Sequence, residues 1–322
     1  MSKKKVAVVF GYNGCDFFGS QIQSGACRTV ESELESALFL SGLISEANHG
    51  NLHKVGWSRA SRTDRGVHAK TTTVAMKMQW PGTPAAALPA LINLHTPADL
   101  KVFAVKEVTS SFNAHGKANY REYEYLFPAK LLLPAGETTL TPALAEQIRT
   151  LTSKFIGTLN FHNYTRKLAF EKPEAKRYIV KFEPHKELIT CEQLTFIRFL
   201  VTGQSFLYHQ IRSMIGAVLA VLMGHWRPED IDASFLAEKK QVPIAPAEGL
   251  FLSQVLYTGY NRKQAQKAVV LSEAEEAAVQ AFYSAAILPS IASAFPAFAA
   301  WRPEAEAASD PESPKPDLPA SP

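Results

Sequence analysis

The sequence predicts an α+β fold, and three observations support that class. Residues 71–80 and 120–127 alternate apolar and polar side chains, as half-buried strands do. Residues 29–42 and 206–223 repeat apolar side chains every three or four positions, which is typical of helices with one buried face. The order strand, helix, strands occurs before residue 110 and again after residue 120. This order is compatible with two similar α/β halves that share one antiparallel sheet.

The N-terminal part is expected to combine strands with two helices. Val6–Phe10 is an apolar run that stops at a turn and is too short for a signal peptide, so it predicts a first strand. Thr29 is placed to cap a helix that continues to about Gly42. The further expected elements are strands at 55–63, 71–80 and 100–108 and a short helix at 85–93.

The C-terminal part is expected to carry the longer helices. In the helix at 206–223, a polar and basic stripe lies beside the apolar one, and Gly216 permits close approach of another backbone. Ser272, with Glu275 three positions later, is expected to cap a helix that ends at Leu288, followed by an extended segment. The polar stripe consists of Ser205, His209, Arg212 and Gly216. The other expected elements are helices at 141–155 and 228–237 and strands at 120–127, 177–183, 194–203 and 250–256.

The composition is that of a mildly basic globular protein. The chain has 322 residues, 46% of them hydrophobic, with a net charge of +4 and a pI near 8.8. This balance permits a nucleic-acid partner without requiring one. The three cysteines are scattered, and no Cys or His pairs have zinc-site spacing, so we expect no metal and no disulfide framework. The expected location is intracellular, in the nucleus or cytoplasm, or in an organelle if a presequence has been removed.

Two segments near the C-terminus differ from the rest. Residues 302–322 are acidic and rich in Pro, Ala and Ser, so we expect a disordered tail. Residues 277–301 carry no charge, but they are mostly Ala and Ser and contain Pro289 and Pro296, which argues against a membrane-spanning helix. We therefore expect an extension at 261–301 that packs on the body, and no membrane contact.

The run Ser61–Ala69 is the strongest candidate for catalytic chemistry. Asp64 lies between Arg62 and Arg65, and neighbouring positive charges favour the ionised form of a carboxylic acid. The two arginines are also suited to bind phosphates. On the residues alone, the run fits equally well a turn in which Asp64 caps the next segment and Gly66 supplies an unusual backbone angle.

This run resembles the signature loop of the TruA-type pseudouridine synthases, whose Arg-Thr-Asp-x-Gly-Val core carries the catalytic aspartate. Four other blocks resemble that family in the same order, and the five blocks together span residues 6 to about 256. The four blocks lie within residues 12–21, 112–125, 205–216 and 245–250. Ser61, in place of a glycine usual in bacterial relatives, is more similar to the eukaryotic tRNA-modifying branch.

The resemblance implies an enzyme that isomerises uridine to pseudouridine in structured RNA, above all tRNA. It implies two halves, 1–115 and 116–260, that share a central antiparallel sheet flanked by helices, with the catalytic cleft between them. The reaction breaks the N1–C1′ bond and joins C5 to C1′. Because no electrons or energy enter, no cofactor is needed. Asp64 is then the carboxylate at the sugar, as nucleophile or as base.

The resemblance also assigns two further catalytic residues. Tyr123 is identified as the active-site tyrosine, whose ring stacks on uracil and whose hydroxyl lies where the C5 proton leaves. On its context alone, Tyr123 fits cross-strand packing as well. Arg212 is placed against Asp64, whereas its context alone fits a snorkelling or structurally paired arginine. Many relatives have a basic residue where this chain has Glu122. This difference puts local RNA contacts in doubt and leaves the role of Tyr123 intact.

The expected RNA contacts lie in several segments. Arg62 is the candidate to fill the place that the flipped uridine leaves. The other candidates are Arg65, His68, Phe161, His162, Asn163, Lys176, Arg177, His209 and Gln210. Such mixtures suit RNA backbone and stacked bases, although 161–165 fits a surface loop equally well and 175–179 an ordinary strand start. His68 and His209 are expected to be structural rather than catalytic.

Two other functions compete with this one. A catalytically silent RNA-binding or RNP-assembly factor on the same fold would have no use for Arg62, Asp64, Tyr123 and Arg212 together. An Asp-dependent nucleoside or sugar hydrolase would need a second catalytic carboxylate, and the five blocks offer none. The expected partner is therefore tRNA or another structured RNA, bound by a monomer or a homodimer.

Overall fold

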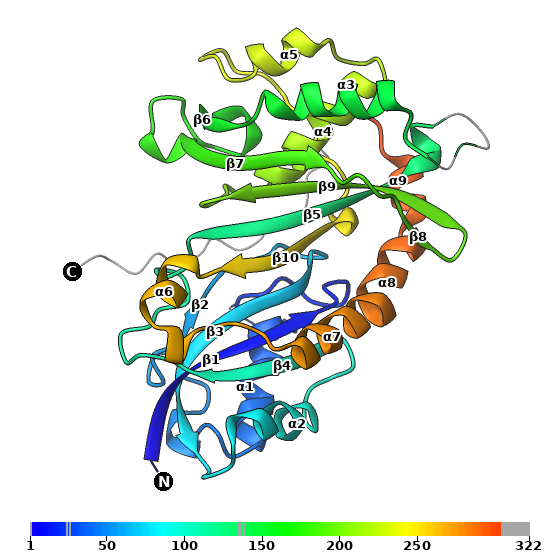
Figure 1. Cartoon of the computed structure of the whole chain (residues 1–322). Coiled ribbons are helices and arrows are strands. Elements are labelled where there is room, and N and C mark those ends of the chain that lie inside the picture. The colour runs from blue at the N-terminus through cyan, green and yellow to red at the C-terminus, as the bar shows by residue number, and fades with distance from the viewer. Residues whose placement is uncertain (1, 24, 26, 134–136, 138, 304–322) are drawn as a thin grey trace.

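A computed structural model describes residues 2–23, 25, 27–133, 137 and 139–303 (Figure 1). These residues form a mixed fold around one ten-stranded sheet, which confirms the predicted α+β class. The strands are β1 (Ser2–Tyr12), β2 (Ser58–Arg59), β3 (His68–Trp80), β4 (Leu100–Glu107), β5 (Tyr120–Pro128), β6 (Gly157–Asn160), β7 (Lys176–Pro184), β8 (Ile189–Cys191), β9 (Leu194–Gly203) and β10 (Leu250–Leu256). Their order is β4-β1-β3-β10-β5-β9-β7-β6, with β2 beside β3 and β8 beside β9. The expected tail at 302–322 lies almost entirely outside the described residues.

The helices pack around this sheet. They are α1 (Val30–Leu40), α2 (Leu88–Asn93), α3 (Pro142–Ser153), α4 (Gln210–Leu222), α5 (Pro228–Ala233), α6 (Thr258–Lys263), α7 (Glu273–Phe282), α8 (Leu288–Ser293) and α9 (Phe295–Ala300). The predicted cap of α1 is confirmed, because the Thr29 side chain accepts a hydrogen bond from the Ser32 amide. Figure 1 shows α7, α8 and α9 running along the molecule from the β4 end of the sheet toward β5.

A short parallel contact joins the strands of the N-terminal and C-terminal parts. The β3–β10 pairing is parallel, and the other pairings are antiparallel. In register across the sheet, Tyr12 lies opposite Ala69, Ala69 opposite Leu252, and Leu252 opposite Tyr123. Residues opposite one another in register point to the same face. Tyr12 and Tyr123 therefore lie on one face, with Ala69 and Leu252 between them, and the Asp64 loop leads into β3 at this place.

The strand expected at 55–63 and the helix expected from residue 206 were wrong in their extent. Of the strand expected at 55–63, only Ser58–Arg59 pairs with β3. Beyond it the backbone turns toward Ser20, whose hydroxyl accepts from the Thr63 amide. The helix expected from residue 206 begins at Gln210, because His209 has a φ of 61°, a left-handed conformation that a right-handed helix does not contain. Ser205 and His209 therefore do not continue a helical stripe.

The rest of α4 confirms the expectation for Gly216. A Cβ atom there would lie 2.2 Å from the Pro243 carbonyl oxygen, so only glycine lets these two backbones approach so closely. The helix expected at 228–237 is shorter, since α5 ends at Ala233.

The C-terminal segment is helical for longer than expected. The capping box of Ser272 and Glu275 is present at the start of α7. After Phe282 the chain continues through one π-helical turn into α8 and α9, where an extended segment was expected. Pro289 and Pro296 lie in the first turns of α8 and α9, the helix positions that tolerate proline best. By length and composition alone, Glu273–Ala300 is long and apolar enough to cross a membrane. In the protein, 39% of the 18-residue apolar stretch within it is buried.

Candidate active site

The Asp64 loop is fixed through its neighbour Thr63. The Thr63 amide donates to the Ser20 hydroxyl at 2.9 Å, and the Ser20 amide donates to the Thr63 carbonyl at 3.1 Å. The hydroxyls of Tyr12 and Thr63 share a hydrogen bond of 2.6 Å. Both the side chain and the main chain of Thr63 are thus held in place. On either side of it, Arg62 is exposed and the Asp64 side chain is 36% exposed.

The loop closes with the turn that the residues alone suggested. The Val67 amide donates to the Asp64 carbonyl at 3.2 Å, and Gly66 has a φ of 79°. A positive φ at the third position of a four-residue turn favours glycine. The backbone turn and the candidate catalytic role of Asp64 are compatible, since the turn uses the carbonyl of Asp64 and leaves its carboxylate to other contacts.

Tyr123 lies on the sheet face that the Asp64 loop covers. Its side chain is buried and meets the ring of Phe206 edge-on, with centroids 5.3 Å apart. Gly203 permits this contact, because a Cβ atom there would come within 2.7 Å of the Phe206 ring. Burial, opposed by Arg121 and assisted by the charge of Asp64, raises the pKa of the Tyr123 phenol. The hydroxyl is therefore protonated at neutral pH.

His209 connects Asp64 with Arg212. The His209 Nε2 atom lies 4.0 Å from Asp64 Oδ2 and 3.4 Å from Arg212 Nη1. Burial, and then Arg212 and Arg166, lower the pKa of His209 to about 3. The imidazole is therefore neutral at pH 7, its contact with Asp64 is no ion pair, and Nε2 accepts from Arg212. The Arg212 Nε–H donates to the Ala245 carbonyl at 2.7 Å, which fixes the guanidinium.

The structure thus brings together Asp64, Tyr123, His209 and Arg212. Asp64 and Arg212 both approach the same imidazole nitrogen, and Tyr123 is close enough to Asp64 for its pKa to respond. A direct Asp64–Arg212 ion pair stays a prediction. His209 lies between these two side chains, and its expected structural role stays a prediction.

The sequence analysis missed Arg121, which holds both sides of this site. Its guanidinium donates to the Ala60 carbonyl at 2.8 and 3.1 Å and to the Gln204 carbonyl at 2.7 Å. Ala60 precedes the Asp64 loop and Gln204 precedes the His209 segment, so one buried cation fixes the two segments relative to each other. The signal was present in the sequence: Arg121 lies two positions before Tyr123 in a strand, and therefore on the same face.

Among the predicted RNA contacts, Arg62 and Arg65 are exposed beside Asp64, whereas His68 and Gln210 are buried. The His68 Nδ1 atom accepts from the Gly14 amide at 3.0 Å, and burial lowers the pKa of His68 to about 4. Gln210 accepts from the Leu207 amide at 2.8 Å. Both side chains hold the backbone around the site and do not face solvent.

Phe161, His162 and Asn163 are also buried, with 0%, 3% and 6% of their surface exposed. Asn163 donates to the carbonyls of Ser234 and Glu238 and accepts from the Lys240 amide. Side chains buried to this degree do not reach RNA from the surface, so the structure does not support a direct contact by these three residues. The burial of these three side chains also argues against the alternative of a surface loop at 161–165.

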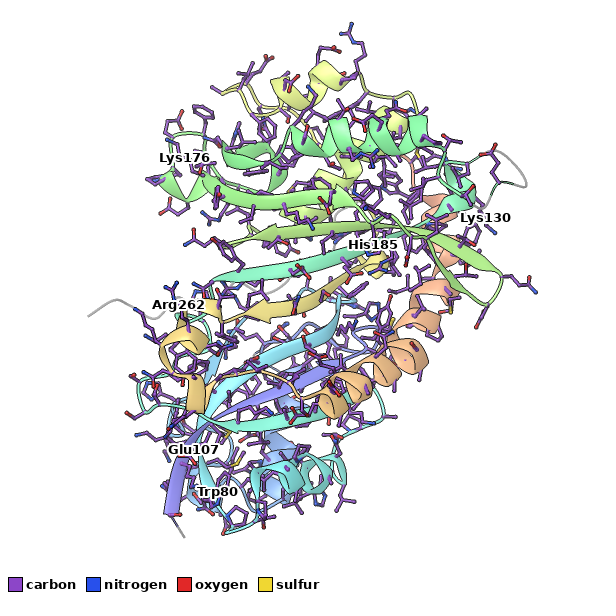
Figure 2. The ribbon with its side chains drawn as sticks, in the orientation of Figure 1. Trp80, Glu107, Lys130, Lys176, His185 and Arg262 are labelled. Carbon is purple, nitrogen blue, oxygen red and sulfur yellow. The ribbon has the colours of Figure 1, made fainter. Side chains whose placement is uncertain are left out.

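Lys176 and Arg177 begin β7 beside that segment. Lys176 is exposed, and Figure 2 shows it at the β6–β7 end of the sheet, opposite the end that carries Trp80 and Glu107. Arg177 is partly buried, and burial lowers its pKa. Within the described part of the chain, no three His, Cys, Asp or Glu side chains are grouped so as to hold a metal ion.

Comparisons with known proteins give the class to which this site is similar. A family model described as tRNA pseudouridine synthase matches residues 151–258. The resemblance found in the sequence is thereby confirmed, since the matched region is similar to the tRNA pseudouridine synthases.

Individual relatives extend the match beyond the region of the family model. The Pseudouridylate synthase 1 homolog of Mus musculus is 33% identical over 272 residues, covering 82% of this chain and 63% of the mouse protein. The tRNA pseudouridine synthase 1 of Eremothecium gossypii is 27% identical over 346 residues, covering 82% and 65%. The tRNA pseudouridine(27/28) synthase of Saccharomyces cerevisiae is 25% identical over 326 residues, covering 80% and 85%. The chain thus spans less than two thirds of the mouse and Eremothecium relatives.

Proposed function

We propose that this protein is a pseudouridine synthase that isomerises uridine to pseudouridine in structured RNA, and that its substrate is tRNA. The observation that carries the proposal is the meeting of Asp64, Tyr123, His209 and Arg212 on one sheet face. The names of the relatives, tRNA pseudouridine synthase and pseudouridylate synthase, support the same reaction and substrate.

The arrangement suits each step of this isomerisation. Asp64 supplies a carboxylate at C1′, as nucleophile or as base, while the N1–C1′ bond breaks. The base turns and C5 joins C1′, after which C5 loses its proton and N1 gains one, so atoms and electrons balance without a cofactor. The neutral Tyr123 phenol faces the base, and Arg212, which donates to His209 Nε2, orients the carboxylate. Arg62, exposed beside Asp64, is suited to fill the place of the flipped uridine.

We also propose the division into halves. Residues 1–115 supply β1 to β4 and residues 116–260 supply β5 to β10, with the catalytic cleft along the β3–β10 contact. Residues 261–301 form an extension that packs against both groups of strands, and residues 302–322 an acidic tail. We propose an intracellular location, in nucleus or cytoplasm, and a monomer or homodimer.

The test is tritium release from tRNA that carries 5-³H-uridine, since loss of the C5 proton reports product formation. We expect Asp64→Asn to abolish release while tRNA affinity stays within about threefold, because the change keeps size and removes the charge. Asp232→Asn is the matched control, since Asp232 lies on α5 in a surface ion pair with Lys154. Appreciable turnover by Asp64→Asn would contradict the assignment. Tight tRNA binding without release by the unaltered protein would favour the silent RNA-binding factor.

A further inference from the structure

Exposed aromatic side chains are few on this protein, and two of them lie next to Asp64. In the described residues, the aromatic side chains with large exposed fractions are Phe18 at 44%, Tyr178 at 44% and Tyr208 at 39%. Exposed rings beside a candidate active site are suited to a ligand with a flat aromatic face, because a ring stacks on such a face.

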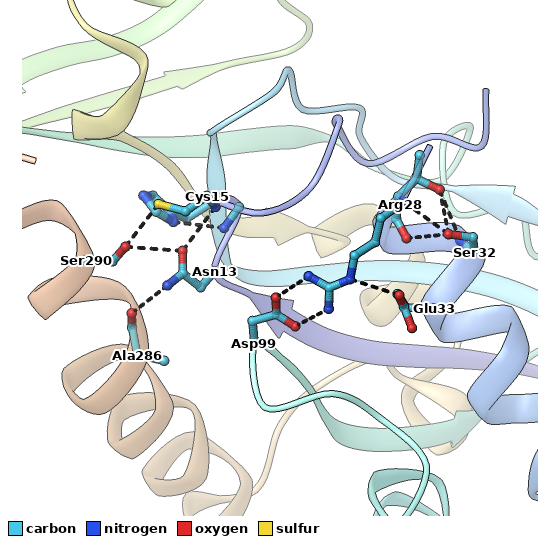
Figure 3. A network of polar contacts seen from close by, with 11 residues as sticks. Asn13, Cys15, Arg28, Ser32, Glu33, Asp99, Ala286 and Ser290 are labelled. Carbon is cyan, nitrogen blue, oxygen red and sulfur yellow. Dashed lines mark hydrogen bonds and ion pairs between the residues drawn. The ribbon is translucent and has the colours of Figure 1, made fainter. Parts of the chain in front are cut away.

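Phe18 approaches Asp64 from the side of Arg65. The Arg65 guanidinium lies 4.6 Å from the centre of the Phe18 ring. The backbone under the ring is fixed, because the Phe18 amide donates to the Arg28 carbonyl at 2.9 Å. Arg28 in turn makes a two-bond ion pair with Asp99, at 2.7 and 2.9 Å, and a third bond to Glu33 (Figure 3).

The same loop is held at its start by the C-terminal helices. The Asn13 side chain donates to the Ala286 carbonyl at 3.0 Å and accepts from the Ser290 hydroxyl at 3.4 Å (Figure 3). The Asn13 amide donates to the Asp99 carbonyl at 2.8 Å. The backbone is therefore held at Asn13, before Phe18, and at Phe18 itself through the Arg28 carbonyl.

Tyr208 approaches Asp64 from the side of His209. Its ring is stacked on the His209 imidazole, with centroids 3.8 Å apart and planes 24° from parallel. The imidazole is buried and its Nε2 atom lies 4.0 Å from Asp64 Oδ2. One face of the Tyr208 ring therefore rests on a fixed partner, and 39% of the side chain is exposed to solvent.

Arg121 fixes the Asp64 loop relative to the Tyr208 segment, because it binds the Ala60 and Gln204 carbonyls at once. The segment of Phe18 is joined to the Asp64 loop by the hydrogen bonds between Ser20 and Thr63. Phe18 contacts Arg65, the residue after Asp64. Tyr208 contacts His209, which lies beside the Asp64 carboxylate. The rings thus approach Asp64 from two separate segments, with the exposed cations Arg62 and Arg65 nearby to attract phosphates.

We propose that Phe18 and Tyr208 stack on the unpaired nucleobases that flank the target uridine, one ring for each flanking base. The proposal rests on the proposed function. A uridine that leaves its stack deprives both neighbours of a stacking partner, and an aromatic ring replaces that contact irrespective of which base is present. The rings would therefore give affinity for an opened strand rather than for one sequence.

Tyr178 provides a matched control. The register pairs Ile179 with Gly203 and Gly203 with Arg121, which shares its face with Tyr123. Because neighbouring strand residues point to opposite faces, Tyr178 points away from the site. It is an exposed tyrosine like Tyr208, so its removal controls for a general loss of aromatic surface.

The experiment uses an RNA hairpin with 2-aminopurine placed before or after the target uridine, bound by the full chain carrying Asp64→Asn. Stacking quenches 2-aminopurine, so we expect binding to keep both positions quenched. Adding Phe18→Ala should relieve quenching at one position and Tyr208→Ala at the other, each with about tenfold weaker binding. Tyr208→Phe should keep both signals, and Tyr178→Ala should change neither.

A second measurement replaces the flanking base by an abasic site. On RNA that lacks the base on which Phe18 stacks, we expect Phe18→Ala to bind as tightly as the protein that keeps Phe18. The same should hold for Tyr208→Ala on RNA that lacks the base on which Tyr208 stacks. Unchanged quenching and affinity in both alanine variants would overturn the proposal and would leave the rings for a protein partner. Failure of the Asp64→Asn protein to bind any RNA would instead contradict the proposed function.

Discussion

Two tripeptides in this chain have the same order of aromatic, histidine and amide, Phe161–Asn163 and Tyr208–Gln210, and the fold uses them differently. In the first, all three side chains are buried, and Asn163 binds the segment from Ser234 to Lys240. In the second, the histidine and the amide are buried while the ring of Tyr208 is exposed. The same residue types therefore build a core in one place and the wall of a site in the other.

The difference comes from what covers each segment. Phe161 lies between the ring of Tyr164, three residues further along the chain, and the ring of Phe235, which follows α5. The second segment follows the end of β9 and enters α4 through the left-handed turn at His209, which leaves Tyr208 on the outside. A left-handed non-glycine residue is strained, and such strain is found where function requires a fixed geometry.

The largest expected effect is on catalysis, at Arg212. We expect Arg212→Ala to lower kcat about 100-fold or more, because the change removes the contacts with His209 and the Ala245 carbonyl and leaves Asp64 misplaced. Arg212→Lys should restore little, since an ammonium cannot make both contacts. Tritium release under single-turnover conditions measures the effect, with the exposed Arg149→Ala as control. Activity within threefold of the unaltered protein would remove Arg212 from the site.

The next effect is on stability, at Asn163. We expect Asn163→Ala to lower the free energy of unfolding by about 2–4 kcal/mol, because it leaves the Ser234 and Glu238 carbonyls and the Lys240 amide without their partner. The activity per folded molecule should stay unchanged. Urea unfolding measures the difference against Asn51→Ala, an exposed control. A loss of RNA affinity without loss of stability would show that Asn163 contacts RNA after all.

A smaller effect concerns pH, since burial lowers the pKa of both His209 and His162. For His209 the folded pKa is about 3 against 6.5 in the unfolded chain, so the unfolded state binds more protons between those values. Stability should therefore fall as the pH drops below about 6.5, by up to about 1.4 kcal/mol per pH unit for this group. The free energy of unfolding, measured from pH 4.5 to 8, should depend less on pH in His209→Gln and in His162→Gln than in the unaltered protein. Unchanged curves would mean that neither histidine is neutral in the fold.

The smallest effect is at Lys176, next to the buried tripeptide. Because Phe161–Asn163 is covered, any RNA contact in that region must come from surface charges such as Lys176. We expect Lys176→Ala to weaken tRNA binding about threefold at low salt and to have no effect at high salt. The slope of log affinity against log salt concentration should fall by the amount that about one phosphate contact contributes. Lys77→Ala, on the far part of the sheet, is the control. Equal effects of the two changes would indicate attraction by net charge alone.

The sequence by itself determined features whose cause lies within a few residues. The cap of α1 at Thr29, the capping box of α7 and the turn at Gly66 each follow from side chains next to the backbone groups that they satisfy. The candidate role of Asp64 also came from one short run, because the motif is contiguous. The α+β class followed from the periodicity of strands and helices, which is a local property as well.

The tertiary structure alone decided burial and long-range partners. The hydrogen bonds of Asn163 reach Ser234, 71 residues away, and Arg121 reaches Gln204, 83 residues away. The left-handed turn at His209 and the helical path after Leu288 likewise depend on what the chain packs against. A local pattern specifies the conformations that a segment prefers. Which side chains lose water is set by segments that meet only when the sheet is complete, and solvation and hydrogen bonding at the site follow from that meeting.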